Sequence, residues 1–471
     1  MRFIIAAVVA AFAVGCATLP EVHPWFQAAD QSRTPTVVGS RGPLSPERAA
    51  AVLAKLSAQG KSDLLSRHVA VEQEVSDAPL ALGNTAALLT DGPAFYASMF
   101  NAIAAARDHV NAEFYTIEDD EVGRRFGDVL LRKAAEGVAV NLMYDSVGSI
   151  DTPPAFFERL RAGGVKVLEY NPVNPLKARA GWRVNNRDHR KVVIVDGRIG
   201  YTGGINISRV YSHGSAPGGS SGKSGGSSPG LGSSGTLSGS SEAGWRDTNV
   251  RLEGPVVAQL QQLFLETWKK QRGEPLAQRD WFPAPARAGE HPARVLASGP
   301  DHPTPAIYVS LLSAIAHAEK TVHITMAYFV PDAQTIAALT GAAARGVDVG
   351  LVLPSYTDFW AVFHAGRSHY AELLDAGVKI YERQTTLLHA KTAVVDGVWS
   401  TVGSSNMDWR SFLHNEEVNA VVLGTGFGKE MEAMFERDVA QSTRIEAESW
   451  ARRPFSVRMR EWAARVWEYW L

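Results

Sequence analysis

The order of apolar and polar positions repeats twice along the chain. Residues 102–120 read AIAAARDHVNAEFYTIEDD and residues 314–332 read AIAHAEKTVHITMAYFVPD, and each predicts an apolar helix that leads into a strand. Gly137 and Gly346, each followed by Val, come after Ala-rich helical stretches and open a buried strand in both halves. Helices and strands in the same order twice predict two tandem α/β sandwich domains related by internal duplication.

Breaks in this pattern set the expected domain boundaries. Pro and Gly punctuate residues 20–43 without a sustained period, and they cluster again at 273–292. Ser45, Pro46 and an acidic first turn predict a helix that ends near Gly60. The predicted segments are a signal peptide at 1–16, a tether with this helix at 17–83, a first domain at 84–275, a second domain at 290–445 and an amphipathic C-terminal helix at 446–471.

One segment of the first domain has no counterpart in the second. In residues 212–243, 12 of 32 positions are Ser and 10 are Gly. Such a composition predicts a flexible coil that buries no core, so we expect a disordered insert. A passive insertion and a functional lid both fit this composition.

Composition and charge narrow the classes of function. The chain has 471 residues, 45% of them hydrophobic, which is enough apolar material for two buried cores. Lys plus Arg is 47 and Asp plus Glu is 49, which gives a net charge of −2 and disfavours a nucleic-acid partner.

The N-terminus has the pattern of a secretory signal. A basic Arg2 precedes an apolar run over residues 3–15 that is too short to span a bilayer. Residues 13–16, AVGC, resemble a bacterial lipobox, in which the Cys is lipidated, and Cys16 is the only Cys in the chain. This predicts a lipid-anchored, periplasm-facing protein of the bacterial cell envelope; Ala17 favours the outer membrane by the sorting rule of such lipoproteins. The alternative is an ordinary signal peptide with a chance Cys.

Two copies of one motif carry the candidate chemistry. His189, Lys191 and Asp196 are matched by His389, Lys391 and Asp396, each set with Gly after the Asp. Each copy is followed by a Gly-containing turn and an Asn, 17 residues after the His. Two such matches at equivalent repeat positions are a strong signal. The members of the motif and its downstream segment are His189, Lys191, Asp196 and Asn206 in the first copy, and His389, Lys391, Asp396, Ser404 and Asn406 in the second.

Strand parity separates these residues. His and Lys lie two apart at the start of a predicted strand, so their side chains project to the same face. Asp196 and Asp396 follow Lys by five residues, at a turn before Gly, so they point elsewhere. We therefore interpret both Asp residues as structural anchors within the motif.

A histidine nucleophile needs a carboxylate to orient it and to stabilise its imidazolium. Glu417 lies 28 residues after His389, and Asp247 takes a comparable position after His189 once the Ser/Gly insert is removed. Both are candidates, against the alternative of two surface acids at strand starts.

Together these residues predict phosphoryl-group chemistry. Two Lys and two Asn side chains can cradle a phosphate. One neutral His can attack phosphorus while a protonated His gives its proton to the leaving alkoxide. No Asp, Glu, His and Cys spacing requires a metal, so we expect a metal-independent reaction without a cofactor.

The duplicated HxKxxxxDG motif resembles the phospholipase D superfamily and, more narrowly, bacterial cardiolipin synthases. Supporting segments are NRDHRK (186–191), YTGGINI (201–207), GWRDT (244–248), YFVP (328–331) and HNEEV (414–418). The resemblance covers about residues 80–445. It implies two phospholipase D-like domains and a phosphatidyl-His intermediate on His189, with His389 as acid and base. It also implies transfer to a second phosphatidylglycerol with release of glycerol.

A hydrolase and a non-catalytic scaffold are the alternatives to a transferase. A hydrolase of the same superfamily would use the same residues with water as acceptor, and a non-catalytic envelope scaffold would not need two intact motifs. The C-terminal segment adds a membrane hint, because Phe455, Met459, Trp462, Val466 and Tyr469 form one helical stripe among Arg residues. Packing of this stripe on the protein body is the alternative.

Overall fold

The computed structural model describes residues 19–29, 35–39, 42–174, 176, 182–213, 244–284, 286–302, 304–466 and 468. Cys16 and the predicted signal peptide lie outside these residues, as do residues 214–243 of the predicted Ser/Gly insert.

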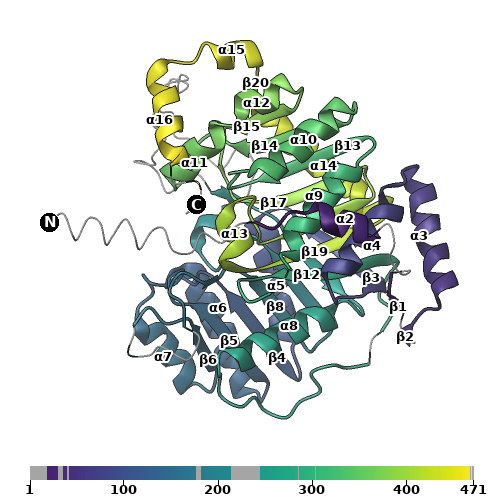
Figure 1. The fold of residues 1–471 in the computed structure, drawn as a ribbon. Helices are drawn as coiled ribbons and strands as arrows, with labels where there is room; N and C mark the ends of the chain where they lie inside the picture. Colours follow the sequence, from purple (N-terminus) through teal and green to yellow (C-terminus); the bar gives the residue numbers. More distant parts are fainter. Residues whose placement is uncertain are drawn as a thin grey trace, which may run out of the picture.

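The first repeat forms the lower half of the molecule in Figure 1. Its mixed sheet has the strand order β6-β5-β4-β8-β9-β11-β3, in which only β4, β5 and β6 pair in parallel. The elements are β3 (Leu80–Leu89), α5 (Gly92–Ala105), β4 (His109–Phe114), α6 (Glu121–Ala135), β5 (Ala139–Asp145), α7 (Pro154–Ala162), β6 (Lys166–Tyr170), β7 (Arg187–Asp188), β8 (Lys191–Val195), β9 (Ile199–Gly203), the 3-10 helix η2 (Arg209–Tyr211), β10 (Trp245–Arg246), β11 (Asn249–Glu253) and α8 (Val257–Lys270).

The second repeat has the same strand order, β15-β14-β13-β17-β18-β19-β12, with β20 added antiparallel at the β15 edge. Its elements are β12 (His291–Ser298), α9 (Ala306–His317), β13 (Thr321–Met326), α10 (Ala333–Ala344), β14 (Asp348–Pro354), α11 (Trp360–Arg367), α12 (Tyr370–Asp375), β15 (Lys379–Arg383), β16 (Leu387–Leu388), β17 (Lys391–Val395), β18 (Trp399–Gly403), α13 (Trp409–Leu413), β19 (Asn415–Leu423), α14 (Thr425–Ala440), β20 (Ser442–Ile445), α15 (Ala447–Ala451) and α16 (Phe455–Arg465).

The two sheets join at β3 and β12. These strands pair antiparallel, with His291 opposite Asn84 and Ala293 opposite Ala81. The matching strand orders on either side of this seam confirm the α/β fold built from two repeats that the sequence predicts.

Local sequence signals recur at equivalent positions of the repeats. Asp120 caps α6 by accepting the N–H of Gly123, and Asp332 caps α10 in the same way. Gly137 and Gly346, which precede β5 and β14, share a φ of 86°, a conformation that favours glycine. The Asp residues thus begin α6 and α10, and the glycines form the turns between these helices and the strands that follow.

The Asp-Gly steps of the motif form the hairpin turns after β8 and β17. Asp196 and Asp396 both have a φ of 52°, and Gly197 and Gly397 follow with φ of 61° and 63°. Two successive positive φ angles are typical of tight hairpin turns with Asp-Gly sequences.

Both faces of each sheet are covered. In the first repeat, Val193 and Val195 pack with α5, α6 and α7, whereas Val192 and Ile194 face α8. The corresponding inner helix of the second repeat, α14, packs in the same central cluster as α8. Burial on both sides of the sheet explains why β8 is continuously apolar from Val192 to Val195.

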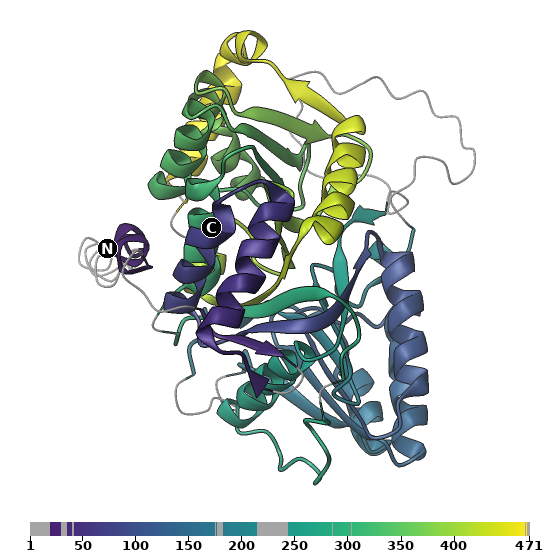
Figure 2. The same ribbon diagram turned by 90° about the vertical axis from the view of Figure 1, so that its right-hand side faces the viewer.

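The N-terminal segment belongs to the folded body, so the globular part begins before the predicted boundary at 84. Strand β3 already starts at Leu80. The N-terminal helices, purple in Figure 2, lie beside the green helices of the second repeat. Leu64, Leu65 and Val69 of α4 pack in one apolar cluster with residues of α9. The helix predicted to end near Gly60 is present as α3, whereas the helix α4 that follows it and the packing of this segment were not predicted. The elements are α2 (His23–Ala29), β1 (Val37–Gly39), β2 (Gly42–Pro43), α3 (Pro46–Gly60) and α4 (Leu64–Val75).

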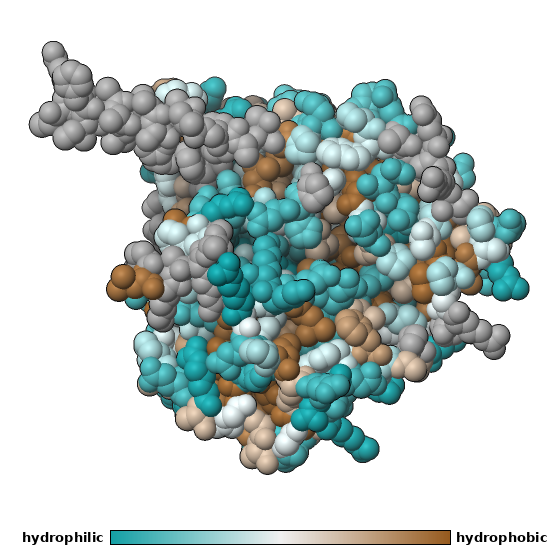
Figure 3. Space-filling model, turned by 60° about the horizontal axis from the view of Figure 1, so that its bottom comes forward, coloured by the Kyte–Doolittle hydropathy of each residue, from teal (hydrophilic) through white to brown (hydrophobic). Residues whose placement is uncertain are grey.

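The surface is mixed in character. On the face drawn in Figure 3, hydrophobic residues are interrupted by hydrophilic ones. Within the described ranges, no helix has both the length and the apolar composition needed to cross a membrane.

Candidate active site

Two short parallel pairings cross between the repeats. Strand β7, which precedes His189, pairs with the start of β19, and β16, which precedes His389, pairs with β10. The backbone N–H of His189 donates to the carbonyl of Glu416 at 3.0 Å, and that of His389 donates to Arg246 at 2.8 Å. Each motif histidine therefore lies beside a strand start of the other repeat.

These crossings bring each histidine to a carboxylate. Nδ1 of His189 lies 3.0 and 3.1 Å from the two carboxylate oxygens of Glu417. Nδ1 of His389 lies 2.6 Å from Oδ2 of Asp247. Both carboxylates are fully buried, and a carboxylate at Nδ1 holds the proton there and leaves Nε2 as the free nitrogen. The structure thus pairs each histidine with the candidate acid from the opposite repeat.

Both histidines line one cavity of about 590 Å³. The cavity walls come from both repeats and combine aromatic with polar side chains. They are Tyr115, Thr116, Glu118, His189, Asn206, Ser208, Val210, Tyr211, Trp245, Tyr328, Asp358, Phe359, Val362, His389, Asn406, Asp408, Arg410, Ser411 and Asn415. Such a space, with few polar groups converging on it, suits a ligand with a charged head and apolar parts.

The motif lysines are buried beside the histidines. Lys191 and Lys391 are each 1% exposed, and each Nζ donates to the backbone carbonyl of its own motif histidine. Burial lowers the pKa of Lys191 to about 7 and that of Lys391 to about 8, against the pull of Glu417 and Asp247. An anionic ligand in the cavity would favour the charged form of both lysines.

The two asparagines line the cavity, whereas Lys191 and Lys391 are not among its lining residues. Oδ1 of Asn206 accepts the N–H of Thr116 at 3.0 Å, and its Nδ2 donates to the hydroxyl of Tyr211 at 3.3 Å. Asn406 lines the same cavity, and its buried Oδ1 has no hydrogen-bond partner in the part of the chain described.

Ser404 acts on a carboxylate rather than on the cavity. Its hydroxyl donates to Glu417, which also accepts from Asn415 Nδ2 at 3.2 Å. The equivalent residue of the first repeat is Gly204, where an added Cβ would lie 2.2 Å from Oδ1 of Asp247. The two carboxylates are therefore held differently. Glu417 accepts a hydrogen bond from the Ser404 hydroxyl, whereas Asp247 packs closely against the backbone of Gly204.

Asp196 and Asp396 lie away from the histidines, as strand parity predicts. The carboxylate of Asp196 accepts backbone N–H groups of residues 107–109 at 2.8 to 3.2 Å. Asp396 does the same for residues 319–321 and also accepts the Ser62 hydroxyl at 2.6 Å. Each Asp holds the start of strand β4 or β13 against the motif hairpin.

The two motif histidines differ in the charges around them, and so in how strongly their pKa is lowered. Burial and the charges of Lys191 and Lys391 hold the pKa of His189 well below its usual value. Burial and Lys391 also lower the pKa of His389, but Asp247 opposes this shift by its charge and its hydrogen bond. His189 is therefore the more strongly neutral of the two.

Glu417, like His189, is buried. Burial raises the pKa of Glu417 to about 7, although Lys191 and the hydroxyl of Ser404 oppose the shift. A carboxyl with such a pKa gives His189 less support as an imidazolium than an ionised acid would.

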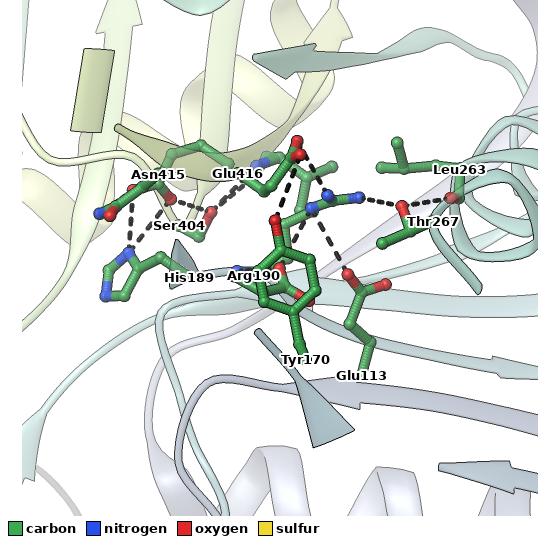
Figure 4. Close-up of polar contacts among 12 residues, drawn as sticks. Glu113, Tyr170, His189, Arg190, Leu263, Thr267, Ser404, Asn415 and Glu416 are labelled. Atoms are coloured by element: carbon green, nitrogen blue, oxygen red, sulfur yellow. Dashed lines mark hydrogen bonds and ion pairs between the residues drawn. The ribbon is translucent and has the colours of Figure 1, made fainter. Parts of the chain in front are cut away.

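Arg190 anchors the backbone next to His189 through a buried polar network. It is buried, its guanidinium donates to Thr267 at 2.9 Å, and it forms an ion pair with Glu416 at 3.0 Å. Figure 4 shows it pointing toward Glu416, Thr267 and Glu113. Glu416 is bound from its other side by Lys270 at 2.8 Å. This network ties β8 to β19 and so holds the neighbouring Glu417 in register.

Sequence reasoning missed the aromatic walls of the cavity. Tyr115 packs edge-on against His189 at 5.0 Å between ring centroids, and Trp245 lies 5.2 Å from His389. Tyr211 lies 3.4 Å from Nδ1 of His389 through its hydroxyl. The positions of two of these residues in the sequence could have predicted them as cavity residues. Tyr115 directly follows β4, and Trp245 belongs to the segment that carries Asp247.

The described residues contain no group of three or more His, Cys, Asp or Glu side chains placed to hold a metal ion. The metal-independent reaction stays a prediction.

The sequence of the chain is similar to one family model and to several proteins that share its name. The family model described as "Cardiolipin synthase, PLD-like domain" matches residues 99–212 and 311–439. The chain is 35% identical over 391 residues to a cardiolipin synthase of Geobacillus kaustophilus, covering 82% of this chain and 72% of that protein. It is 34% identical over 381 residues to cardiolipin synthase 2 of Bacillus cereus, covering 80% and 69%.

A solved structure has the same fold. The phosphatidylserine synthase of Haemophilus influenzae superposes with a TM-score of 0.62 at 12% identity, covering 85% of this chain and 98% of that one.

Proposed function

Because the chain belongs to the cardiolipin synthase family of phospholipase D-like proteins, and is thus a phosphatidyltransferase, we propose that it joins two phosphatidylglycerol molecules through a phospho-histidine intermediate. The observation that carries this proposal is the pair of histidines that line one cavity, each with a buried carboxylate at Nδ1. This arrangement supplies one nucleophile and one acid-base group on either side of a phosphorus atom.

In the first half-reaction, Nε2 of His189 attacks the phosphorus of the donor lipid. The bond between phosphorus and the headgroup glycerol oxygen breaks, and protonated His389 gives its proton to that oxygen. Lys191 and Lys391 balance the charge that develops on the phosphoryl oxygens. Free glycerol leaves, and the phosphatidyl group stays on His189.

In the second half-reaction, neutral His389 removes the proton from a headgroup hydroxyl of a second phosphatidylglycerol. The alkoxide attacks phosphorus and the bond to Nε2 of His189 breaks. The products are cardiolipin and the starting enzyme, so atoms and protons balance over the cycle.

The electrostatics of the site support the assignment of the two roles. A nucleophile must be neutral, and the pKa of His189 is held well below its usual value by burial and by both motif lysines. An acid must be protonated, and Asp247 at 2.6 Å favours the imidazolium of His389. The anionic donor phosphate would favour it further.

The location in the cell is part of the same proposal. A lipid on Cys16 would hold the enzyme in the bacterial envelope, facing the periplasm, close to substrates that reside in a bilayer. The lipobox-like sequence at residues 13–16 and the lipid substrates of the family support this placement.

The test is a product and adduct assay on the purified full chain. Phosphatidylglycerol vesicles are supplied with a metal chelator, and lipids and protein are analysed by mass spectrometry under neutral denaturing conditions. We expect cardiolipin, glycerol and a phosphatidyl adduct on His189. Phosphatidic acid without cardiolipin would make the chain a hydrolase, and an adduct on His389 would reverse the two roles.

A further inference from the structure

The apolar stripe of α16 faces outward. Phe455 is 73% exposed, Met459 44%, Trp462 65% and Val466 69%. These residues are spaced by four, three and four positions, so they share one side of the helix. The structure thereby decides against packing of this stripe on the protein body.

The opposite side of α16 is fixed to the second repeat. Val457, Glu461 and Ala464 are buried. The carboxylate of Glu461 pairs with Arg453 at 2.9 Å, and the guanidinium of Arg453 lies 4.6 Å from the ring centre of the buried Trp450. The helix therefore cannot turn its stripe inward without breaking a half-buried ion pair.

Helix α11 connects this stripe to the active-site cavity. It packs beside α16 (Figure 1), and Val362 lines the cavity while belonging to the same apolar cluster as Ala464. At the N-terminal end of α11, Phe359 lines the cavity and is 48% exposed, and Trp360 is 37% exposed. Exposed apolar side chains are thus found both at the cavity rim and on the helix behind it.

Positive charge flanks the stripe. Arg458 and Arg465 are exposed and lie on α16 seven residues apart, so they form one edge of the apolar side. Arg452 is exposed just before the helix and pairs with Glu448 at 2.5 Å, and Arg465 lies 3.9 Å from Glu468, so among the described residues Arg458 alone of these three has no ion-pair partner. Arg side chains beside exposed Trp and Phe match a surface that is anionic outside and apolar beneath.

We propose that Phe359, Trp360, Phe455, Met459, Trp462 and Val466 form a docking face for an anionic phospholipid bilayer. This inference rests on the proposed function, because it gives that function a route for its substrate. With the docking face on the membrane, a lipid headgroup beside α11 enters the cavity while its acyl chains stay in apolar surroundings.

A second copy of the chain is a poorer occupant. Two docking faces that pair with their α16 helices antiparallel would bring Arg458 and Arg465 of both copies to the same edge, and like charges in contact repel. A bilayer with anionic headgroups removes this conflict, so charge favours lipid.

The first test places a reporter on α16. Cys16 is the only cysteine, so the full chain with Cys16→Ser accepts a polarity-sensitive fluorophore at an added cysteine. Ser456→Cys lies at the edge of the stripe, and Ser45→Cys, exposed before α3, is the matched control. With vesicles of phosphatidylcholine and phosphatidylserine we expect a blue shift at position 456 only. No shift there, or equal shifts at both positions, would overturn the proposal.

The second test separates docking from catalysis. Phe455→Ser with Trp462→Ser should lower turnover of vesicle phosphatidylglycerol about tenfold or more and leave turnover of a monomeric short-chain phosphatidylglycerol unchanged. Arg458→Gln should weaken vesicle binding about fivefold. Phe282→Ser and Arg48→Gln, exposed elsewhere, are the controls and should change neither.

The outcomes distinguish the two proposals. If the parent chain does not turn over monomeric phosphatidylglycerol, the proposed function fails, while the fluorophore still tests the docking face. If the double variant keeps full vesicle turnover, or changes only a dimer to a monomer in sedimentation, the docking face is not a lipid surface.

Discussion

His189 of the first repeat contacts both carboxylate oxygens of Glu417 of the second, at 3.0 and 3.1 Å. The converse contact joins His389 to Asp247 at 2.6 Å. The orienting acid of each histidine thus lies 228 or 142 residues away in the chain and in the other repeat. Neither repeat holds a complete catalytic pair by itself.

Removing either acid should therefore impair catalysis strongly. Asp247→Asn and Glu417→Gln keep the size of the side chains but remove the charge that holds the proton on Nδ1. We expect kcat to fall about 10²- to 10⁴-fold in each. Steady-state assays on phosphatidylglycerol vesicles measure this. Asp358→Asn, a cavity carboxylate that contacts neither histidine in the structure, is the control, and an equal loss there would contradict the pairing.

The roles of the two histidines can be separated by the leaving group. A phosphatidyl ester of p-nitrophenol needs no general acid, because its phenolate leaves unaided. His389→Ala should therefore release one equivalent of nitrophenol in a burst, and His189→Ala should release none. Stopped-flow absorbance follows this burst. A burst in His189→Ala with none in His389→Ala would exchange the roles.

The acid limb of the pH profile should report Glu417. Burial raises its pKa to about 7, so the carboxylate that orients His189 is ionised above this pH and is lost below it. We expect kcat/KM to decline as the pH falls through about 7. The hydroxyl of Ser404 lowers this pKa, so Ser404→Ala should move the limb to higher pH. Ser405→Ala, whose hydroxyl bonds Asn406 instead, should leave it in place. If the pKa of this limb is the same in Ser404→Ala as in the parent chain, the limb reports a group other than Glu417.

Gly204 should not tolerate a side chain. A Cβ there would lie 2.2 Å from the carboxylate of Asp247, so Gly204→Ala must displace the acid that orients His389. We expect a loss of kcat of about 10²-fold or more with a folded protein, as judged by circular dichroism. Gly341→Ala, on the surface of α10 with only the far end of Arg345 near, is the matched control. Full activity of Gly204→Ala would mean that the placement of Asp247 is not critical.

Asp396 should matter for stability rather than for chemistry. It accepts three backbone N–H groups and the Ser62 hydroxyl, and it is 7% exposed. Asp396→Ala should lower the free energy of unfolding by about 3 kcal/mol, and Asp196→Ala, without the hydroxyl, by about 2 kcal/mol. Urea unfolding measures both, with the exposed Asp128→Ala as reference. Lost turnover at unchanged stability would place Asp396 in the chemistry.

Periodicity predicted the repeat and its strands because local apolar patterns define them. The motif hairpins follow from the Asp-Gly sequence, and strand parity alone predicts that Lys191 and Asp196 point in different directions. The crossing of β7 with β19 could not be predicted, because two-residue strands carry no pattern and their partners are more than 200 residues apart.

Other features depend on three-dimensional packing. The outward direction of the α16 stripe follows from the pair of Glu461 with Arg453, since an amphipathic pattern alone does not say which side meets the body. Tyr115 and Trp245 both belong to the first repeat but lie far apart in the chain, and the walls that they form meet only in the folded protein.

The antiparallel seam of β3 and β12 relates the halves as a twofold axis relates the subunits of a homodimer. A single-repeat ancestor that paired with itself would have shared its histidine and acid between subunits in the same way. Every substitution in such a dimer would appear twice. A single chain that holds both repeats is free of that restriction, and this one carries differences that no homodimer could hold: arginine at 190 against alanine at 390, glycine at 204 against serine at 404, and arginine at 246 against glutamate at 416.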